Sequence, residues 1–495
     1  MLVVFISEAA VLVQLLGSRA APVLEELLDS LRHAIVHHSF AVRQAAAWCV
    51  RAQGDACPDT LRPLFSIFAN QWARALKVAA ADKPESISRL KGVGSAVAAL
   101  LSCVGTKPLK AIHDMPTAVL PQALALAKEA AIAGAAAAAA PAPANTNPAA
   151  GLVAGDAAAL ATAKAEAAWL LIASCVDLGP AIVRGSLPEL VLAWRGFQAP
   201  AKKDLKHEND WRHVLRSMES ALGAAHMFLV SCRGELLTAD ATAAIAHLLT
   251  VAMTTSTMTP SSVKYQSGLL RARMYSCFAA LPIKAFESHV NIVTSAMELF
   301  CSETTMTSML PRRCDPRDAL LGRFTVPTAS IDGELESLLM MPTSAALEYD
   351  PLLVVWESPR SATLEGSFKL GVPLAPPPEV AAVDAAIRVF GNIFPALPAA
   401  SQEKLLDSLL KLAKKKRAVS TANILCATLG IVKASFTKAA SLKKDRVLVS
   451  MQEIITLSLG STEPLYRCAA AEAYGKYVSI IVCYCLLTYH LGLPR

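Results

Sequence analysis

The sequence predicts an all-α fold, specifically an α-solenoid (an α-α superhelix) built from stacked helical hairpins. The composition is 54% hydrophobic but only 6% aromatic and 18% charged, and much of the excess is Ala and Leu, which favour helices. Apolar residues recur every three to four positions along most of the chain, as on one face of a helix. At 495 residues the chain is also too long for a single compact core.

The first clear helix pair lies between residues 24 and 50. Apolar residues step by three and four from Leu24 to Ile35, and the pattern resumes at Val42 after a break at 37–39. Ser39 is expected to cap the second helix. Neither helix could bury its apolar stripe alone, so the two are expected to pack as a hairpin.

The same layout recurs near the far end of the chain. Residues 461–477 (STEPLYRCAAAEAYGKY) match 39–52 (SFAVRQAAAWCVRA), and one residue separates each of Arg43 and Arg467 from the triple alanine that follows. A guanidinium at this position is expected to bind turn carbonyls or an acidic neighbour and to fix one helix pair onto the next. Small side chains allow helices to approach closely, and the whole unit is typical of HEAT-type repeats of about 40–47 residues.

Helices of similar character fill much of the remaining sequence. Further helices are expected at 58–80, 89–104, 117–133, 157–178, 181–197, 211–232, 239–254, 264–280, 284–301, 380–394, 401–416, 419–435 and 445–460. The predicted organisation is N-terminal HEAT repeats at 1–133, a low-complexity Ala/Pro insert at 134–156, central HEAT repeats at 157–301, a long irregular insertion at 302–378, C-terminal HEAT repeats at 379–477 and a divergent apolar tail at 478–495. Within the long insertion, LLVVW (352–356) could form a short strand paired with GSFKLGV (366–372).

No catalytic or cofactor motif stands out. The sequence contains no HExxH, GxSxG, GxxxxGK[ST] or CxxC, and Gly92-Val93-Gly94 lacks the third glycine of a dinucleotide loop, so we interpret it as a helix start. His33, His37 and His38 could suggest a metal, but two ligands on one face do not make a site, and polar residues at a helix end are favoured. We therefore expect no cofactor and no metal.

An enzyme remains an alternative only within the 302–378 insertion. Arg312, Arg313, Asp315 and Asp318 gather there. Charged loops of this kind are usually solvated, so a non-enzymatic protein is favoured.

The tryptophans and the basic residues have structural explanations. Trp48 and Trp169 both follow paired alanines, which favours packing between helices over peptide binding, whereas Trp194 fits either role. Basic residues at 411–417 and 433–446 follow helix ends and are interpreted as a solvated face, with an anionic membrane, an acidic partner or nuclear import as alternatives. The net charge of +7 is too small for this length to indicate nucleic acid.

The cysteines and the apolar ends bear on location. Many of the 12 cysteines lie in apolar runs, such as Cys49, Cys103 and Cys175, which is typical of free thiols in a reducing compartment. Residues 1–17 lack the basic start of a secretory signal and carry Glu8. Residues 477–493 are at the lower limit of a membrane span, so both segments are expected to be helices of the array, with a tail anchor as the alternative for the second.

Several longer stretches share a distinctive pattern; they lie at 41–52, 165–197, 271–289, 347–351, 380–395 and 463–476. Together and in this order they resemble the HEAT-repeat-containing protein 5 family. The stretch AEAAWLLIASCVDLGPAIVRGSLPELVLAWRGF (165–197) is the most specific, because generic HEAT repeats do not share its Trp, Gly-Pro and Trp-Arg positions. The Ala-rich insert and the end after Lys476 depart from the family, and its members are several times longer, so the chain is expected to be an internal piece or a truncated gene model.

The resemblance implies a function in membrane traffic. The family consists of very large α-solenoids that accompany the clathrin adaptor AP-1 with aftiphilin and the synergins. It therefore implies a non-enzymatic cytoplasmic scaffold for protein binding, peripheral to the trans-Golgi network and endosomes through its partners, in vesicle transport between them. No catalytic residue carries over. The alternative is a karyopherin-type transport receptor that binds cargo proteins, against which the slight positive charge argues.

Overall fold

The computed structural model describes most of the helical sequence. It describes residues 1–79, 84–104, 114–139, 148–200, 205, 207–285, 289–302, 352, 355, 378–415, 418–438, 445–461, 467 and 470–479. All regular structure in these residues is helical, with no strand. The predicted all-α class is therefore confirmed.

The chain divides into two compact units. The first joins Met1–Cys277 with Pro342–Pro378, and the second joins Phe278–Met341 with Glu379–Arg495. Helices from the predicted repeat regions 1–133 and 157–301 pack against each other within the first unit, across the Ala/Pro insert between them.

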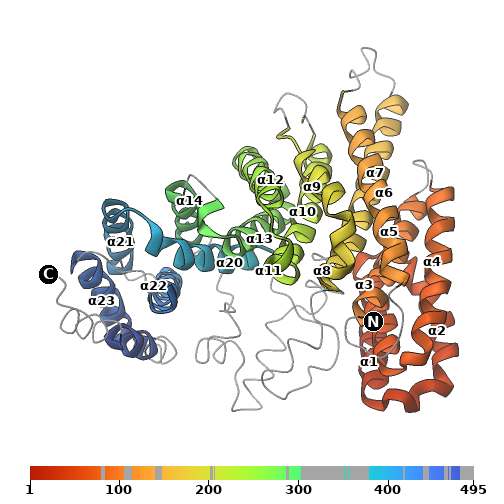
Figure 1. Ribbon diagram of the computed structural model, residues 1–495, viewed down its shortest axis with the longest axis horizontal. Coiled ribbons are helices and arrows are strands. Elements are labelled where there is room, and N and C mark those ends of the chain that lie inside the picture. Colours follow the sequence, from red (N-terminus) through yellow and green to blue (C-terminus); the bar gives the residue numbers. More distant parts are fainter. Residues whose placement is uncertain are drawn as a thin grey trace. The chain divides into compact units, whose positions relative to one another are not determined.

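The first unit begins with helices that pack as sequential hairpins (Figure 1). They are α1 (Leu2–Leu16), α2 (Leu24–Ile35), α3 (Phe40–Ala56), α4 (Leu61–Val78), α5 (Pro84–Val104), α6 (Asp114–Ala139) and α7 (Pro148–Asp177). Helix α2 packs on α3, α4 on α5 and α6 on α7, while α3, α5 and α7 also contact one another in chain order. Each hairpin therefore covers the apolar stripe of the next.

The remaining helices of the first unit continue this pattern of contacts within and between hairpins. They are α8 (Pro180–Val183), α9 (Leu187–Arg195), α10 (Glu208–Ser231), α11 (Arg233–Leu236), α12 (Ala239–Met258) and α13 (Lys264–Ala280). Helix α10 packs on α7, and α9 packs on both α6 and α12. The predicted helix 181–197 is divided at Arg184–Ser186, where a short 3-10 turn precedes Pro188 in the first turn of α9.

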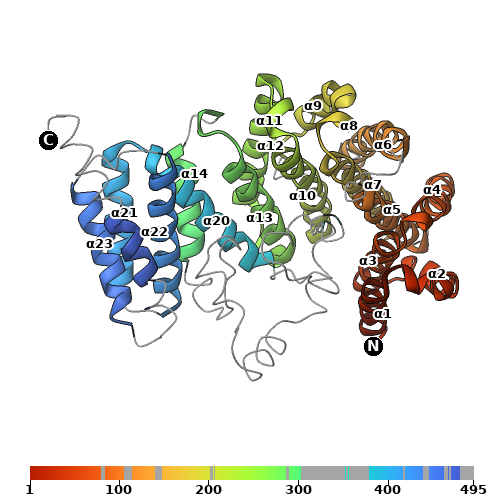
Figure 2. The same cartoon turned by 60° about the horizontal axis from the view of Figure 1, so that its bottom comes forward.

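The second unit is a smaller group of helices (Figure 2). Its described members are α14 (His289–Cys301), α20 (Pro378–Ile393), α21 (Ala399–Lys414), α22 (Ala418–Lys438) and α23 (Asp445–Leu459), with a further helical stretch at 470–479. Phe300 of α14 meets Phe390 of α20 edge to face at 5.4 Å. Helices α20 and α22 cross at Gly391 and Gly430, where a Cβ added at Gly391 would lie 2.8 Å from the Gly430 backbone.

Three local predictions differ from the structure. Ser39 stands at the N-cap of α3, but its side chain makes no capping bond; its backbone N–H donates instead to His37 Nδ1 at 3.1 Å. Gly92 does not start a helix, because α5 begins at Pro84. The Ala/Pro insert is shorter than predicted, since α6 continues to Ala139 and α7 begins at Pro148, leaving only 140–147 outside the described residues.

The predicted strand at 352–356 is also wrong where it is described. The Val355 N–H donates to the Leu352 carbonyl at 2.9 Å, and Val355 is helical. Leu352 and Val355 are both buried, so burial explains their apolar character without a sheet. The predicted partner strand, the rest of the 302–378 insertion with its charged cluster, and 480–495 of the tail lie outside the described residues.

Four helical stretches among the described residues are long and apolar enough to cross a membrane, judged by length and composition. They are Leu2–Ile35, Glu85–Val104, Ala157–Asp177 and Ala239–Met258. The last three are half-buried or more by their neighbours, which accounts for much of their apolar character. The first is only 17% buried, and Phe5, Leu12 and Leu15 of α1 are exposed.

Candidate functional site

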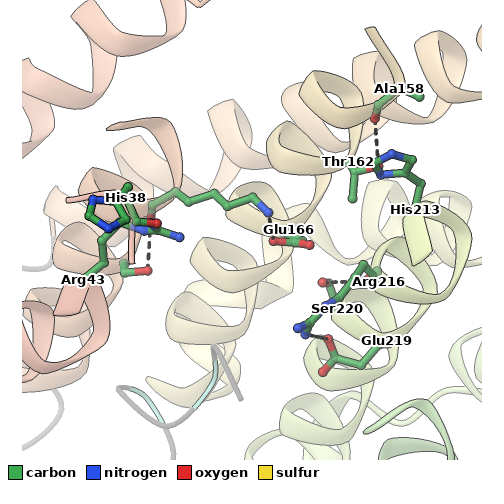
Figure 3. Close-up of polar contacts among 11 residues, drawn as sticks. His38, Arg43, Ala158, Thr162, Glu166, His213, Arg216, Glu219 and Ser220 are labelled. Carbon is green, nitrogen blue, oxygen red and sulfur yellow. Dashed lines mark hydrogen bonds and ion pairs between the residues drawn. The ribbon is translucent and has the colours of Figure 1, made fainter. Parts of the chain in front are cut away.

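The most distinctive feature of the first unit is a series of charged side chains that crosses its packed helices. We call this series the charged ladder; its members are Arg43 of α3, Lys91 of α5, Glu166 of α7, Arg216 and Glu219 of α10, and Arg273 of α13. Figure 3 shows Arg43, Glu166 and Arg216 following one another across the helices. Each of these helices contributes at least one charged side chain to the charged ladder. Packing of apolar side chains between the helices would not by itself require these charges.

Arg43 binds the turn between α2 and α3. Its Nη1 donates to the carbonyl oxygens of His37 and His38, each at 2.7 Å. The side chain is only 6% exposed, and burial lowers its pKa while Glu166 partly opposes that effect. Two charge-assisted bonds to a turn hold the end of α2 against the start of α3.

Lys91 and Glu166 form the ion pair that joins α5 to α7. Lys91 Nζ lies 2.7 Å from Glu166 Oε2, and the two side chains are 26% and 12% exposed. Burial acts to raise the pKa of Glu166, but Lys91, Arg216 and Arg43 hold it below its usual value. The carboxylate is therefore ionised and shared electrostatically by three helices.

The far end of the charged ladder joins α10 to α13. Arg273 Nε donates to Glu219 Oε1 at 3.2 Å, and Arg216 lies 3.9 Å from the same carboxylate. Glu219 is only 1% exposed. A carboxylate at this depth needs such partners, because an unpaired buried charge is strongly destabilising.

A threonine and a histidine beside the charged ladder are not arranged as a nucleophile and its base. Thr162 Oγ1 lies 3.1 Å from His213 Nδ1 but also 2.9 Å from the Ala158 carbonyl, which can only accept. The threonine proton is used by that carbonyl, so His213 Nδ1 must donate to Thr162 rather than remove its proton. Burial and Lys91 lower the pKa of His213, which keeps the ring neutral.

The structure also places the other residues singled out in the sequence. Arg467 donates to the Ser461 carbonyl at 2.9 Å, so both arginines reach a carbonyl six residues earlier. Trp48 and Trp169 are both buried; the Arg51 guanidinium lies 5.0 Å from the Trp48 ring, and Phe197 lies 6.1 Å from the Trp169 ring. Trp194 is fully buried against Phe228, so its role is packing.

The histidines and cysteines occupy sites that explain them structurally. The rings of His37 and His38 lie 4.0 Å apart, tilted by 33°, while His33 bonds the Asp29 carbonyl. Across the described residues no three metal-ligating side chains gather. The described cysteines are free thiols. Burial raises the pKa of Cys49 and of Cys175 to about 12, which makes them unreactive.

The basic residues near the end of α21 are exposed and partly paired. Lys414 pairs with Glu453 at 2.6 Å, and Arg446 pairs with Asp407 at 3.0 Å. Lys411 and Lys415 are exposed. These contacts fit the solvated face inferred from the sequence.

The sequence alone pointed to Arg43 but not to the rest of the charged ladder. Lys91, Glu166 and Glu219 lie in long helices with no motif around them, and only the packing of α5, α7 and α10 brings them into one row. A charge within an otherwise apolar helical stretch, as at Glu166 and Glu219, is the signal that could have revealed them. The comparisons with known proteins add no assignment, since no family model matches the sequence and no solved structure matches it.

Proposed function

We propose that the chain is a HEAT-type α-solenoid that acts as a non-enzymatic scaffold for protein binding in AP-1-linked traffic between the trans-Golgi network and endosomes. The observation that carries the proposal is the row α3, α5, α7 and α10, in which each helix packs on the next and carries a member of the charged ladder. Stacked hairpins offer an extended surface to partners without a deep pocket.

Two further features support a binding role. The charged members that face solvent are only half-buried, with Lys91 26% and Arg216 22% exposed, so they are accessible to polar groups of a partner. The polar pair that most resembles a catalytic arrangement is Thr162 with His213. There the threonine hydroxyl donates to the Ala158 carbonyl, so His213 donates to Thr162 and does not accept its proton. The trafficking role and its partners rest on the family resemblance of the stretches described above.

Binding to purified partners tests the proposal. The full chain, immobilised, is exposed to purified AP-1 and to aftiphilin and synergin fragments, with an unrelated helical-repeat protein as the control. Saturable binding to at least one of them, absent from the control, is the expected result. No binding to any of the three by a chain whose circular dichroism is helical would contradict the trafficking role.

A further inference from the structure

One side of α21 in the second unit carries three exposed lysines, Lys404, Lys411 and Lys415. Their spacing of seven and four residues places them on one face of the helix. That face lies opposite Leu406 and Leu409, which are fully buried. Among the described residues no carboxylate forms an ion pair with any of the three lysines, so this face is positively charged and open to solvent.

The stability of α21 explains only part of this arrangement. A cation in the last turn complements the helix dipole, which accounts for Lys411 and Lys415. Lys404 stands in the second turn of a helix that begins at Ala399, where the dipole does not favour a cation. Lys411 and Lys415 are also four residues apart, and two like charges at that spacing destabilise a helix.

The acidic side chains nearest this face are engaged elsewhere. Arg446 donates to Asp407 Oδ2 at 3.0 Å, and Lys414 Nζ lies 2.6 Å from Glu453 Oε1. Glu403 lies four residues before Asp407, on the same side of α21 as that residue and away from the three lysines. The charge of the lysine-bearing face is therefore left for an anion outside the described residues.

We propose that the lysine face of α21, formed by Lys404, Lys411 and Lys415, binds an anionic membrane surface directly. The three positions extend over about 16 Å along the helix, and they project from one convex helix rather than from the walls of a groove that would hold a peptide. Lysine is a mobile point charge without the fixed fork of arginine, which suits a plane of anionic headgroups. Helix α21 has no aromatic residue on which a nucleobase could stack.

Binding to protein-free vesicles tests the lysine face and does not depend on the trafficking partners. The full chain is floated with phosphatidylcholine vesicles and with vesicles containing roughly one third phosphatidylserine. It should bind the anionic vesicles at least tenfold more tightly than the neutral ones, and high salt should remove the difference. The triple variant Lys404→Gln, Lys411→Gln and Lys415→Gln should lose at least tenfold in affinity for the anionic vesicles, since each lysine near such a surface contributes roughly fivefold.

A matched variant controls for the loss of charge. Arg74→Gln, Lys77→Gln and Lys128→Gln remove three exposed cations from the first unit and should leave vesicle binding unchanged. Equal binding of anionic vesicles by the wild-type chain and the lysine variant, or no preference of the wild-type chain for anionic vesicles, would overturn the proposal. Soluble poly-glutamate that displaced the vesicles at equal charge concentration would also overturn it, because the face would then be a site for an acidic peptide.

Discussion

Individual arginines in this chain bind backbone carbonyls that lie six residues before them. Arg43 and Arg467 share their spacing to an alanine cluster and to the carbonyl they bind. They differ in setting, because Arg43 is buried and bonds two carbonyls, whereas the bond from Arg467 to the Ser461 carbonyl is exposed. The arginine at this position of the unit is therefore expected to contribute different amounts to stability in the two copies.

Replacing each arginine with methionine measures that difference. Arg43→Met should lower the free energy of unfolding by about 2–3 kcal/mol, because two turn carbonyls lose a charged donor. Arg467→Met should cost less than about 1 kcal/mol, since water can replace an exposed donor. Urea unfolding followed by circular dichroism gives both values, and equal losses would show that burial does not set the strength of the contact.

The ionisation of Glu166 makes the stability that the charged ladder contributes depend on pH. Its pKa is lowered in the folded state, so its contribution to stability is present above the unfolded-state pKa and is lost as pH falls through the folded-state pKa. Glu166→Gln should therefore cost roughly 2 kcal/mol at pH 7, and the difference from the wild-type chain should shrink towards zero below about pH 4.

An exposed ion pair provides the control for Glu166. Lys164 Nζ lies 2.6 Å from Glu129 Oε1, but that carboxylate is 61% exposed. Glu129→Gln should change stability by less than about 1 kcal/mol at any pH. Urea unfolding between pH 3 and 8 compares the two variants, and a pH-independent loss in Glu166→Gln would contradict the assigned ionisation.

At the scale of the helix, glycines set how closely neighbouring elements approach. A Cβ added at Gly92 of α5 would lie 1.7 Å from the Ile35 carbonyl oxygen at the end of α2. That atom belongs to the backbone, so it cannot move aside as a flexible side chain would. Gly92 thus fixes the crossing of α2 and α5 beside Arg43.

Gly92→Ala should destabilise the chain even though alanine is the better helix former. Overpacking at this crossing is expected to cost about 3 kcal/mol. Gly475→Ala, in the helical stretch 470–479 where nothing lies within 4 Å, should instead stabilise by up to about 1 kcal/mol. Thermal melting distinguishes the two signs; a rise in Tm for Gly92→Ala would show that α2 and α5 do not meet as described.

The helices themselves were predictable from sequence, but their contacts were not. The apolar period placed α2, α3, α12 and α23 close to their observed bounds, because the period depends only on local geometry. Gly92 was misassigned as a helix start because its role depends on Ile35, which lies in another hairpin. Likewise, LLVVW has the composition of a strand, yet its two described residues, Leu352 and Val355, are buried and joined by a backbone bond typical of a turn.

At the scale of the whole molecule, helices of the first unit contact mainly their near neighbours in the chain. In the first unit α3 contacts α5, α5 contacts α7 and α7 contacts α10. In the repeat array that we propose, a destabilising change in one hairpin lowers the stability mainly of the adjacent hairpins. In a single cooperative globule, the same change would lower stability throughout the protein.

Hydrogen exchange by mass spectrometry on paired variants tests this claim most directly. Gly92→Ala should speed exchange in α2, α3 and α5 and leave α21–α23 unchanged, whereas Gly391→Ala, at the α20–α22 crossing, should speed exchange in α20 and α22 and leave α2–α5 unchanged. A uniform increase across both units in either variant would contradict the account.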